Sequence, residues 1–574
     1  MNTVFEQAKQ KRTFVSPTIS IDSWQSIQPY FEYLQNYEIT DVDSTIQWML
    51  KRSELEAVLE EDLAWRYIKM NCNTQDQKLA QSFQLFVSQI QPEVQKASNS
   101  LDKKILASPY ISQLPKEYTI ALRDIANRES LFCEANVPII AELQQQEQEY
   151  GVINSKMTVH IDGQEKTLQQ AAVYLKSTDR ALRKQVFEQI SERRMLDAEA
   201  LQKLLTDLIT KRHTIACNAG YQNYRDYKLQ ELGRFDYTKE DCFAFHNSIR
   251  ACVPPIVKEI QRKRLATLGY ESLKPWDTEV DTDNKPALVP FTSIDDFIRK
   301  SVACFNSLDP SYGEYLQTMY SQGYMDLESR VGKAPGGFNY PLYESNMPFI
   351  YMNAAGTIRD VETLMHEGGH ALHSFFSSHL PLVEFKSLPS EVAELASMSM
   401  ELLSMEHWDV FFDNAEDVKR AKISQLEGII SILSWIAIVD EFQHRLYENP
   451  YHTIEERTHI WMQLLESHET HMIDWQGWEH VRAVSWQKQL HIYEVPFYYI
   501  EYGIAQLGAI AIWKNYKHNP KETIKQYENM LRTGYTCTIP KIYAKAGIQF
   551  SFTQEYVSDL LQYVYSELQV LYSY

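Results

Sequence analysis

The sequence predicts a mainly α-helical protein with one small β element, and three observations carry that prediction. Long segments place apolar residues three or four positions apart, as one face of a helix does; residues 52–70, 74–97 and 167–213 are the clearest examples. Only 19 glycines occur in 574 residues, so the turn residues that many short strands need are scarce. Residues 331–352 are rich in glycine, proline and aromatic residues, which favours a small sheet there.

Taken in order, the helical pattern is interrupted at few places. Residues 1–195 predict a helical N-terminal region, broken only at Met157–Leu168, where apolar and polar residues alternate around an Asp-Gly pair. That alternation indicates a short hairpin. Residues 271–293 hold several Pro and Asp with little periodicity, which is typical of a long loop. Beyond Arg359 the pattern is helical nearly to the end.

Composition and charge narrow the class of protein. A formal net charge of −20 disfavours binding to nucleic acid or to anionic membranes. The seven cysteines form no CxxC pair, so we expect free thiols in a reducing compartment. The N-terminus has no apolar stretch after its basic residues, which argues against a secretory signal. The longest apolar run, 428–439, is shorter than the roughly 20 residues that span a bilayer, and we expect a cytoplasmic protein.

The central motif is HExxH, formed by His366, Glu367 and His370 with glycines between them. On a helix, positions i and i+4 lie on one face, so both imidazoles can bind one ion. Thr357 or Asp360 could cap the start of that helix. Glu367 follows the first histidine, where its carboxylate can reach a water rather than the metal.

The two glycines of the motif are unusual in a helix interior, where each costs about 0.5–1 kcal/mol relative to alanine. They predict that another part of the protein approaches the helix backbone closely at Gly368 and Gly369.

A zinc site with an open position needs a third protein ligand, and the next predicted helix offers one. Residues 389–401 place Glu391 and Glu394 one turn apart, with Glu401 two turns beyond Glu394 on the same face. Glu394 lies among apolar residues, where an unpaired carboxylate is costly, so we favour it over Glu391. We expect His373 to be a packing residue, because three imidazoles over three turns cannot share one ion.

Two further segments could contact a substrate. Tyr499 and Tyr502 are three residues apart, and His491 precedes them, so their phenols could donate hydrogen bonds to an oxyanion. Aromatic residues at helical spacing are more often core, and the sequence alone leaves both roles open. In residues 336–338, Gly336 and Gly337 could let the backbone approach a ligand, but an ordinary tight turn has the same pattern.

Three blocks of this sequence, HEGGHALH, SEVAELASMSMELL and HIYEVPFYYIEYGIAQLGA, together resemble the thimet oligopeptidase/oligoendopeptidase F family of zinc metallopeptidases, and the bacterial oligoendopeptidase F branch most of all. The resemblance implies that one zinc ion per chain is held by His366, His370 and Glu394, with Glu367 as the general base. It also implies that Tyr499 and Tyr502 hydrogen-bond the substrate carbonyl and the tetrahedral intermediate, with His491 nearby. The implied substrate-contacting loop consists of Gly336, Gly337 and Phe338. A register shift of one would exchange Tyr498 for Tyr499.

The resemblance further implies an elongated, two-lobed helical molecule with a deep substrate channel and a small β-sheet near the active site. Residues 1–195 would form part of the channel wall and 196–574 the catalytic domain. The expected reaction is hydrolysis of internal bonds in short unstructured peptides, by a cytoplasmic monomer or small homo-oligomer that binds neither nucleic acid nor membranes.

Two other functions remain open on the sequence. A zinc exopeptidase, such as a carboxy- or dipeptidyl-peptidase, needs a group that holds a free peptide terminus. The three motif blocks and the residues just ahead of the HExxH motif contain one arginine that could do this, Arg359. A catalytically inactive peptide-binding protein is the other alternative, and the presence of every motif residue argues against it.

Overall fold

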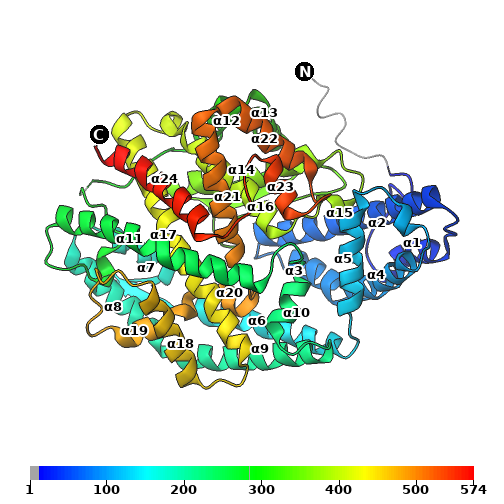
Figure 1. The fold of residues 1–574 in the computed structure, drawn as a ribbon, viewed down its shortest axis with the longest axis horizontal. Coiled ribbons are helices and arrows are strands. Elements are labelled where there is room, and N and C mark those ends of the chain that lie inside the picture. The colour runs from blue at the N-terminus through cyan, green and yellow to red at the C-terminus, as the bar shows by residue number, and fades with distance from the viewer. Residues whose placement is uncertain (1–11, 284, 574) are drawn as a thin grey trace. The chain divides into compact units, whose positions relative to one another are not determined.

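The computed structural model describes residues 12–283 and 285–573, and in these the chain is mainly helical with two small sheets (Figure 1). The prediction of a mainly α fold is therefore confirmed. The expectation that the N-terminus is not a secretory signal concerns a segment that includes residues 1–11. These residues lie outside the described residues.

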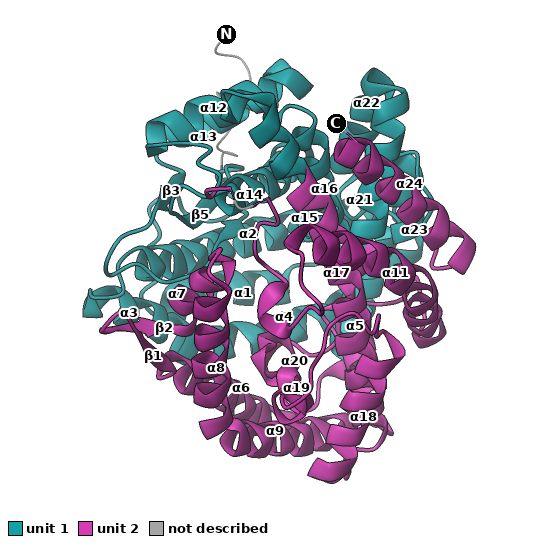
Figure 2. Ribbon diagram, turned by 90° about the vertical axis from the view of Figure 1, so that its left-hand side faces the viewer, with its two compact units in different colours: residues 1–130, 288–422, 505–550 teal, residues 131–287, 423–504, 551–574 magenta. Residues whose placement is uncertain are grey.

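The chain forms two compact units, and each is assembled from three separate stretches of sequence (Figure 2). The first unit comprises residues 1–130, 288–422 and 505–550, and the second comprises 131–287, 423–504 and 551–574. Two of the five boundaries between them fall within long helices, α17 (Ala415–Glu448) and α21 (Ile500–His518). The others fall at the end of α5 (Tyr118–Leu131), ahead of α12 (Ile294–Leu308) and between α23 (Ile539–Lys545) and α24 (Gln554–Ser573).

The first unit holds the three-stranded sheet and most of the N-terminal helices. Its elements are α1 (Trp24–Asn36), α2 (Val42–Cys72), α3 (Gln77–Leu85), α4 (Gln91–Leu106), α5 (Tyr118–Leu131), α12 (Ile294–Leu308), α13 (Pro310–Ser321), β3 (Met325–Glu328), β4 (Phe338–Tyr340), β5 (Phe349–Ala354), α14 (Ile358–Ser377), α15 (Val383–Lys386), α16 (Ser390–Met405), α22 (Pro520–Thr533) and α23 (Ile539–Lys545).

The second unit holds the hairpin and a set of helices from the middle and the end of the chain. Its elements are α6 (Asn136–Ser155), β1 (Thr158–Ile161), β2 (Gln164–Thr167), α7 (Leu168–Ala172), α8 (Arg180–Leu196), α9 (Ala198–Asn218), α10 (Tyr224–Glu231), α11 (Lys239–Leu268), α18 (Ile454–Ser467), α19 (Glu479–Ala483), α20 (Leu490–Glu494) and α24 (Gln554–Ser573).

Both predicted β elements are present. β1 and β2 pair antiparallel around Asp162 and Gly163, whose φ angles of 52° and 74° are those of a tight hairpin turn. In the glycine- and aromatic-rich segment, β4 pairs antiparallel with β5, and β5 also pairs in parallel with β3, giving the order β3-β5-β4. The sequence analysis did not predict β3, because its four residues pair only with a distant strand.

The central strand β5 fixes the small sheet to the N-terminal helices of its own unit. Phe349 and Tyr351 are buried in one cluster with Ala64 and Ile68 of α2. Phe338 of β4 stacks on Tyr351 with ring centroids 4.6 Å apart. This packing holds β4 at one edge of the sheet.

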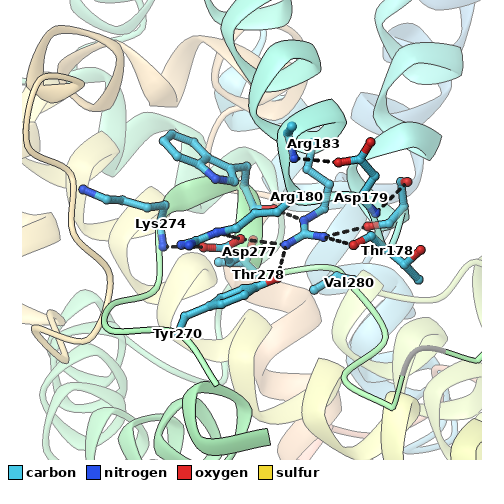
Figure 3. Close-up of polar contacts among 12 residues, drawn as sticks. Thr178, Asp179, Arg180, Arg183, Tyr270, Lys274, Asp277, Thr278 and Val280 are labelled. Carbon is cyan, nitrogen blue, oxygen red and sulfur yellow. Dashed lines mark hydrogen bonds and ion pairs between the residues drawn. The ribbon is translucent and has the colours of Figure 1, made fainter. Parts of the chain in front are cut away.

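A buried ion-pair network fixes the predicted loop 271–293 to α8 in the second unit (Figure 3). Asp277 lies 2.7 Å from Arg180 Nη2 and 2.8 Å from Arg183 Nη2, and the side chains of Arg183 and Asp277 are fully buried. Burial raises the pKa of Asp277, but hydrogen bonds from the two guanidinium groups outweigh it and hold that pKa below its usual range. The described residues of this loop are irregular apart from a short 3-10 turn at Pro275–Asp277 and an isolated β-bridge between Leu273 and Ile473.

The longest apolar run lies in α17. By length and composition alone this helix could cross a membrane, but 56% of its most apolar stretch is buried within the protein, as in a core helix. Ile438, Val439 and Phe442 of α17 belong to a hydrophobic cluster of buried residues in the second unit, so this part of the helix is core.

Candidate metal centre

The HExxH motif lies on α14, whose start is capped as the sequence predicts. The Asp360 carboxylate accepts hydrogen bonds from the backbone N–H groups of Thr357 (2.7 Å) and Ala355 (2.9 Å), which satisfies donors at the helix start. β5 ends four residues before the helix, so the sheet and its connection position the first turn of α14.

The two motif glycines allow two other helices to approach α14. A Cβ atom on Gly369 would lie 2.6 Å from Ser397 Cα and 2.7 Å from the Ala396 carbonyl oxygen of α16. A Cβ atom on Gly368 would lie 2.5 Å from the Phe305 ring of α12. The predicted close approach is therefore present, and it brings α16 beside the histidine face of α14 (Figure 1).

This close packing brings together the three residues that the sequence analysis proposes as metal ligands. His366, His370 and Glu394 each offer one ligand atom, and these atoms lie within 4.8 Å of one another. His366 Nε2 is 3.3 Å and His370 Nε2 is 3.9 Å from the same Glu394 oxygen. Two ligands about 2.05 Å from a tetrahedral zinc ion lie about 3.3 Å apart, so the set fits such an ion. Glu391 is not part of this group of described residues.

Glu401, two helical turns beyond Glu394 on α16, also contacts this group of residues. Its carboxylate lies 2.7 Å from His366 Nδ1, which leaves Nε2 of the same ring free to face Glu394. Carboxylates in this position fix the orientation and tautomer of a metal-binding imidazole. The sequence placed Glu401 on the right face of α16, but it gave no sign of the contact with His366.

The environment separates the pKa values of the two glutamates. Burial raises the pKa of Glu367 to about 7, although the charge of His366 acts against it. Burial also disfavours the charge on Glu394, but the hydrogen bond and charge of His366, the charge of His370 and a hydrogen bond from Ser397 together outweigh burial and lower the pKa to about 2. A carboxylate that stays ionised, as on Glu394, is suited to bind a metal ion. A carboxyl group that titrates near neutrality, as on Glu367, is suited to transfer a proton.

His373 is buried behind the centre. Neither ring nitrogen has a hydrogen-bond partner among the described residues, and burial lowers its pKa to about 3. A neutral imidazole without polar partners packs as an apolar group. This agrees with the expectation that His373 is a packing residue.

The predicted glycine loop lies in the same unit as the centre. Gly336 has a φ of 108°, which favours glycine, and Phe338 begins β4 directly afterwards. The next residue, Asn339, donates a hydrogen bond from its side chain to the Glu367 carbonyl oxygen (3.3 Å). This bond ties β4, an edge strand, to the helix that carries the motif.

The aromatic residues proposed to act on the substrate lie together in the second unit. The His491 ring centroid is 4.8 Å from that of Tyr499 and 5.8 Å from that of Tyr502. His491 lies in the short helix α20, and Tyr499 directly precedes the first residue of α21. The rings of Tyr498 and Tyr499 both pack against that of Tyr502, with ring centroids 5.3 and 5.6 Å away, respectively.

Fold and candidate centre together define a class: a helical protein in which an HExxH helix and a glutamate of a later helix bring together three side chains that could hold one metal ion. Comparison with known proteins identifies the family. Peptidase family M3 matches residues 173–560, and the Peptidase M3 N-terminal domain matches residues 18–149. The chain belongs to peptidase family M3.

Several curated relatives of this chain are bacterial oligopeptidases. An oligoendopeptidase F homolog of Borreliella burgdorferi is 24% identical over 63% of this chain and 60% of its own length. The oligopeptidase PepF of Bacillus subtilis is 23% identical over 46% of this chain and 39% of its own length. The chain thus matches less than two thirds of the length of these relatives.

Solved structures share the fold over nearly the whole chain. A structure of PZ peptidase A with an inhibitor has a TM-score of 0.88 and 25% identity, and the match covers 98% of this chain and 99% of the other. A crystal structure assigned as an oligoendopeptidase F has the same TM-score at 24% identity, with 97% and 99% covered. The helical fold with small sheets is therefore that of the oligoendopeptidase F structures.

Proposed function

We propose that this protein is a zinc-dependent endo-oligopeptidase that hydrolyses internal bonds of short unstructured peptides. The observation that carries the proposal is the cluster of ligand atoms on His366, His370 and Glu394, with the buried Glu367 carboxyl beside them. Family membership and the names of the relatives, oligoendopeptidase F and oligopeptidase, support the same activity.

The donor set suits zinc, with two imidazoles and one carboxylate leaving a fourth position open. When bound, one zinc ion per chain supplies a Lewis acid that lowers the pKa of water and polarises a carbonyl group. Glu367 accepts the proton of the attacking water and donates it to the leaving amine, a transfer for which a pKa near 7 is well placed. Glu401 holds the His366 ring in orientation.

In this proposal the tyrosines act on the oxyanion and the glycine loop acts on the substrate backbone. Tyr502 and Tyr499 donate hydrogen bonds to the carbonyl oxygen as its charge develops, and His491 supports them. Gly336, Gly337 and Phe338 contact the peptide beside edge strand β4, where an extended chain could pair with the backbone.

The remaining parts of the proposal follow from the resemblance and the composition. Residues 1–195 form part of the wall of a deep channel and 196–574 the catalytic domain. The protein acts in the cytoplasm as a monomer or small homo-oligomer, without binding nucleic acid or membranes, in keeping with its charge of −20.

The test is cleavage of an internally quenched peptide that is blocked at both ends, combined with metal analysis. We expect cleavage that a chelator abolishes and zinc restores. Glu367→Gln should keep the metal and lose about 10²–10⁴-fold in kcat, since a positioned general base contributes about that much. Glu394→Ala should lose the metal, whereas Glu391→Ala is the matched control and should keep it.

Other outcomes select the alternatives. Cleavage of peptides with a free terminus, but none of the blocked peptide, would identify an exopeptidase. Peptide binding without zinc and without cleavage would identify a binding protein. Tyr502→Phe should lower kcat more than it raises KM, and comparison of Tyr498→Phe with Tyr499→Phe decides which phenol assists it.

A further inference from the structure

A second cluster of potential metal ligands lies in the second unit, on helices that carry none of the proposed catalytic or metal-binding residues. Cys242 of α11 and Asp440 and His444 of α17 each offer a ligand atom, and these atoms lie within 4.8 Å of one another. All three residues are at most 1% exposed. They are as close together as the ligand atoms of the centre on α14 and α16, and they are more deeply buried.

The spacing on the two helices is that of paired ligands. Asp440 and His444 are four residues apart on α17, and Cys242 and His246 are four residues apart on α11. Residues at i and i+4 share a helix face, so two such pairs converge where their helices meet. The fourth member, His246, lies with Nε2 2.8 Å from Asp440 Oδ2, within hydrogen-bond distance.

Several polar atoms of the cluster have no hydrogen-bond partner among the described residues. These are Oδ1 of Asp440, both ring nitrogens of His444 and Nδ1 of His246. His444 Nε2 is 3.2 Å from Asp440 Oδ2 but makes no hydrogen bond with it. That separation matches the 3.3 Å between His366 and Glu394, and it is the distance expected for two ligands of one tetrahedral ion.

The charge of Asp440 is also left without a nearby guanidinium or ammonium group. Histidines are the basic residues within ion-pair distance of it in the described part of the chain. The neighbouring arginines are engaged elsewhere: Arg250 pairs with Glu441, and Arg225 pairs with Asp226 and Glu448. A fully buried carboxylate in such a place is costly unless a cation binds it.

We propose that Cys242, Asp440 and His444 form a second, structural transition-metal site of the zinc class. Thiolate, imidazole and carboxylate together select zinc or cobalt over calcium and magnesium, which prefer oxygen ligands. His246 completes the site by holding the Asp440 carboxylate in place through its hydrogen bond.

The site would stabilise the segment that leads to the tyrosine cluster. Phe497 has a φ of 66°, a left-handed conformation that is unusual for phenylalanine, and it is fully buried. Its N–H donates to the side chain of Gln443 (2.9 Å), and its ring lies 5.1 Å from that of His444. An ion bound by α11 and α17 would thus stiffen the wall against which Phe497 packs, one residue before Tyr498.

Cobalt substitution tests the proposal without relying on activity. The protein is stripped with a chelator, reloaded with Co²⁺ and examined for the near-ultraviolet charge-transfer band that only a thiolate ligand produces. The centre on α14 and α16 has no sulfur ligand, so the band reports on a cysteine outside that centre, and the Cys242 variant below assigns it. We expect the band in the wild type, together with a second equivalent of bound cobalt.

Matched variants separate this site from the proposed catalytic one. Cys242→Ser should lose the band and one metal equivalent, whereas Cys252→Ser, on the same helix, should keep both. Glu394→Ala should keep the band, so failure of the catalytic proposal does not affect this test. If Cys242→Ser does not fold, His444→Gln gives the same readout, with circular dichroism as the check of folding.

Wild-type protein that binds a single cobalt equivalent without a thiolate band would overturn the proposal. The cluster would then be a buried hydrogen-bonded network of histidines and Asp440. A band that persists in Cys242→Ser would overturn it as well, because another cysteine would then be the ligand.

Discussion

Replacing Gly369 by alanine tests the packing on which the metal centre depends. The added Cβ would meet Ser397 Cα at 2.6 Å and the Ala396 carbonyl oxygen at 2.7 Å, and neither backbone atom can move without its helix. Restoring ordinary contacts of about 3.5 Å requires α14 and α16 to separate by about 1 Å. Metal–ligand distances tolerate about 0.2 Å, so Glu394 would leave its position beside His366 and His370.

The expected loss of stability follows from the same contacts. Overpacking costs about 1–3 kcal/mol, and a clash with backbone favours the upper end of that range. In a helix interior alanine is about 1 kcal/mol more favourable than glycine, which offsets part of the overpacking cost. We therefore expect Gly369→Ala to lower the free energy of unfolding by about 2 kcal/mol. We further expect zinc affinity to fall by about 10–100-fold, as when the support of a metal ligand is lost.

The assay combines thermal unfolding with a zinc titration by a competing chelator. Gly428→Ala in α17 is the matched control, since its Cβ would meet nothing within 4 Å. That variant should gain up to about 1 kcal/mol and keep its zinc affinity. If Gly369→Ala were as stable as Gly428→Ala and bound zinc like the wild type, the helices would not approach as closely as described.

Three further variants probe other parts of the molecule. Glu401→Gln should weaken zinc binding by about 10–100-fold through loss of the charged partner of His366, and unchanged zinc affinity would refute that role. Burial lowers the pKa of Lys386 from 10.5 to about 8, so the folded protein loses stability as pH falls from about 10.5 through 8. Lys386→Met should therefore raise the free energy of unfolding at pH 7 by up to about 3 kcal/mol. Above pH 10.5 thermal unfolding should show no difference between the variant and the wild type. Asp277→Ala leaves buried guanidinium charge unpaired and should cost about 3–5 kcal/mol in urea unfolding. Asp474 pairs with Lys274 in a partly exposed position, so Asp474→Ala is a control that should change stability much less.

The sequence predicted those features that depend on local periodicity and on short motifs. The helix around HExxH, its cap at Asp360 and the turn at Asp162 all follow from residue types a few positions apart. The unusual glycines predicted a close approach to α14, but only the structure identifies α12 and α16 as the partners.

Features that depend on distant parts of the chain could not be predicted. β3 pairs in parallel with β5 across more than 20 residues, and Glu401 meets His366 only because α16 packs on α14 in one register. Asp440 and His444 have the spacing of a ligand pair on one helix, but no spacing rule relates them to Cys242 of α11. The choice between Tyr498 and Tyr499 stays open, since both rings contact Tyr502.

The assembly of the first unit from three stretches of chain sets the order in which the centre can mature during synthesis. All three proposed ligands have been translated by residue 394, long before the helices that support them. Tyr527 of α22 donates to the Ala396 carbonyl oxygen, and Tyr543 of α23 to that of Glu391. On a ribosome the ligands therefore emerge well before the supports that fix α16, and a chain truncated before residue 520 would carry the entire motif without these supports. Nascent and prematurely terminated chains would thus lack two of the hydrogen bonds that hold the glutamate-bearing helix in place.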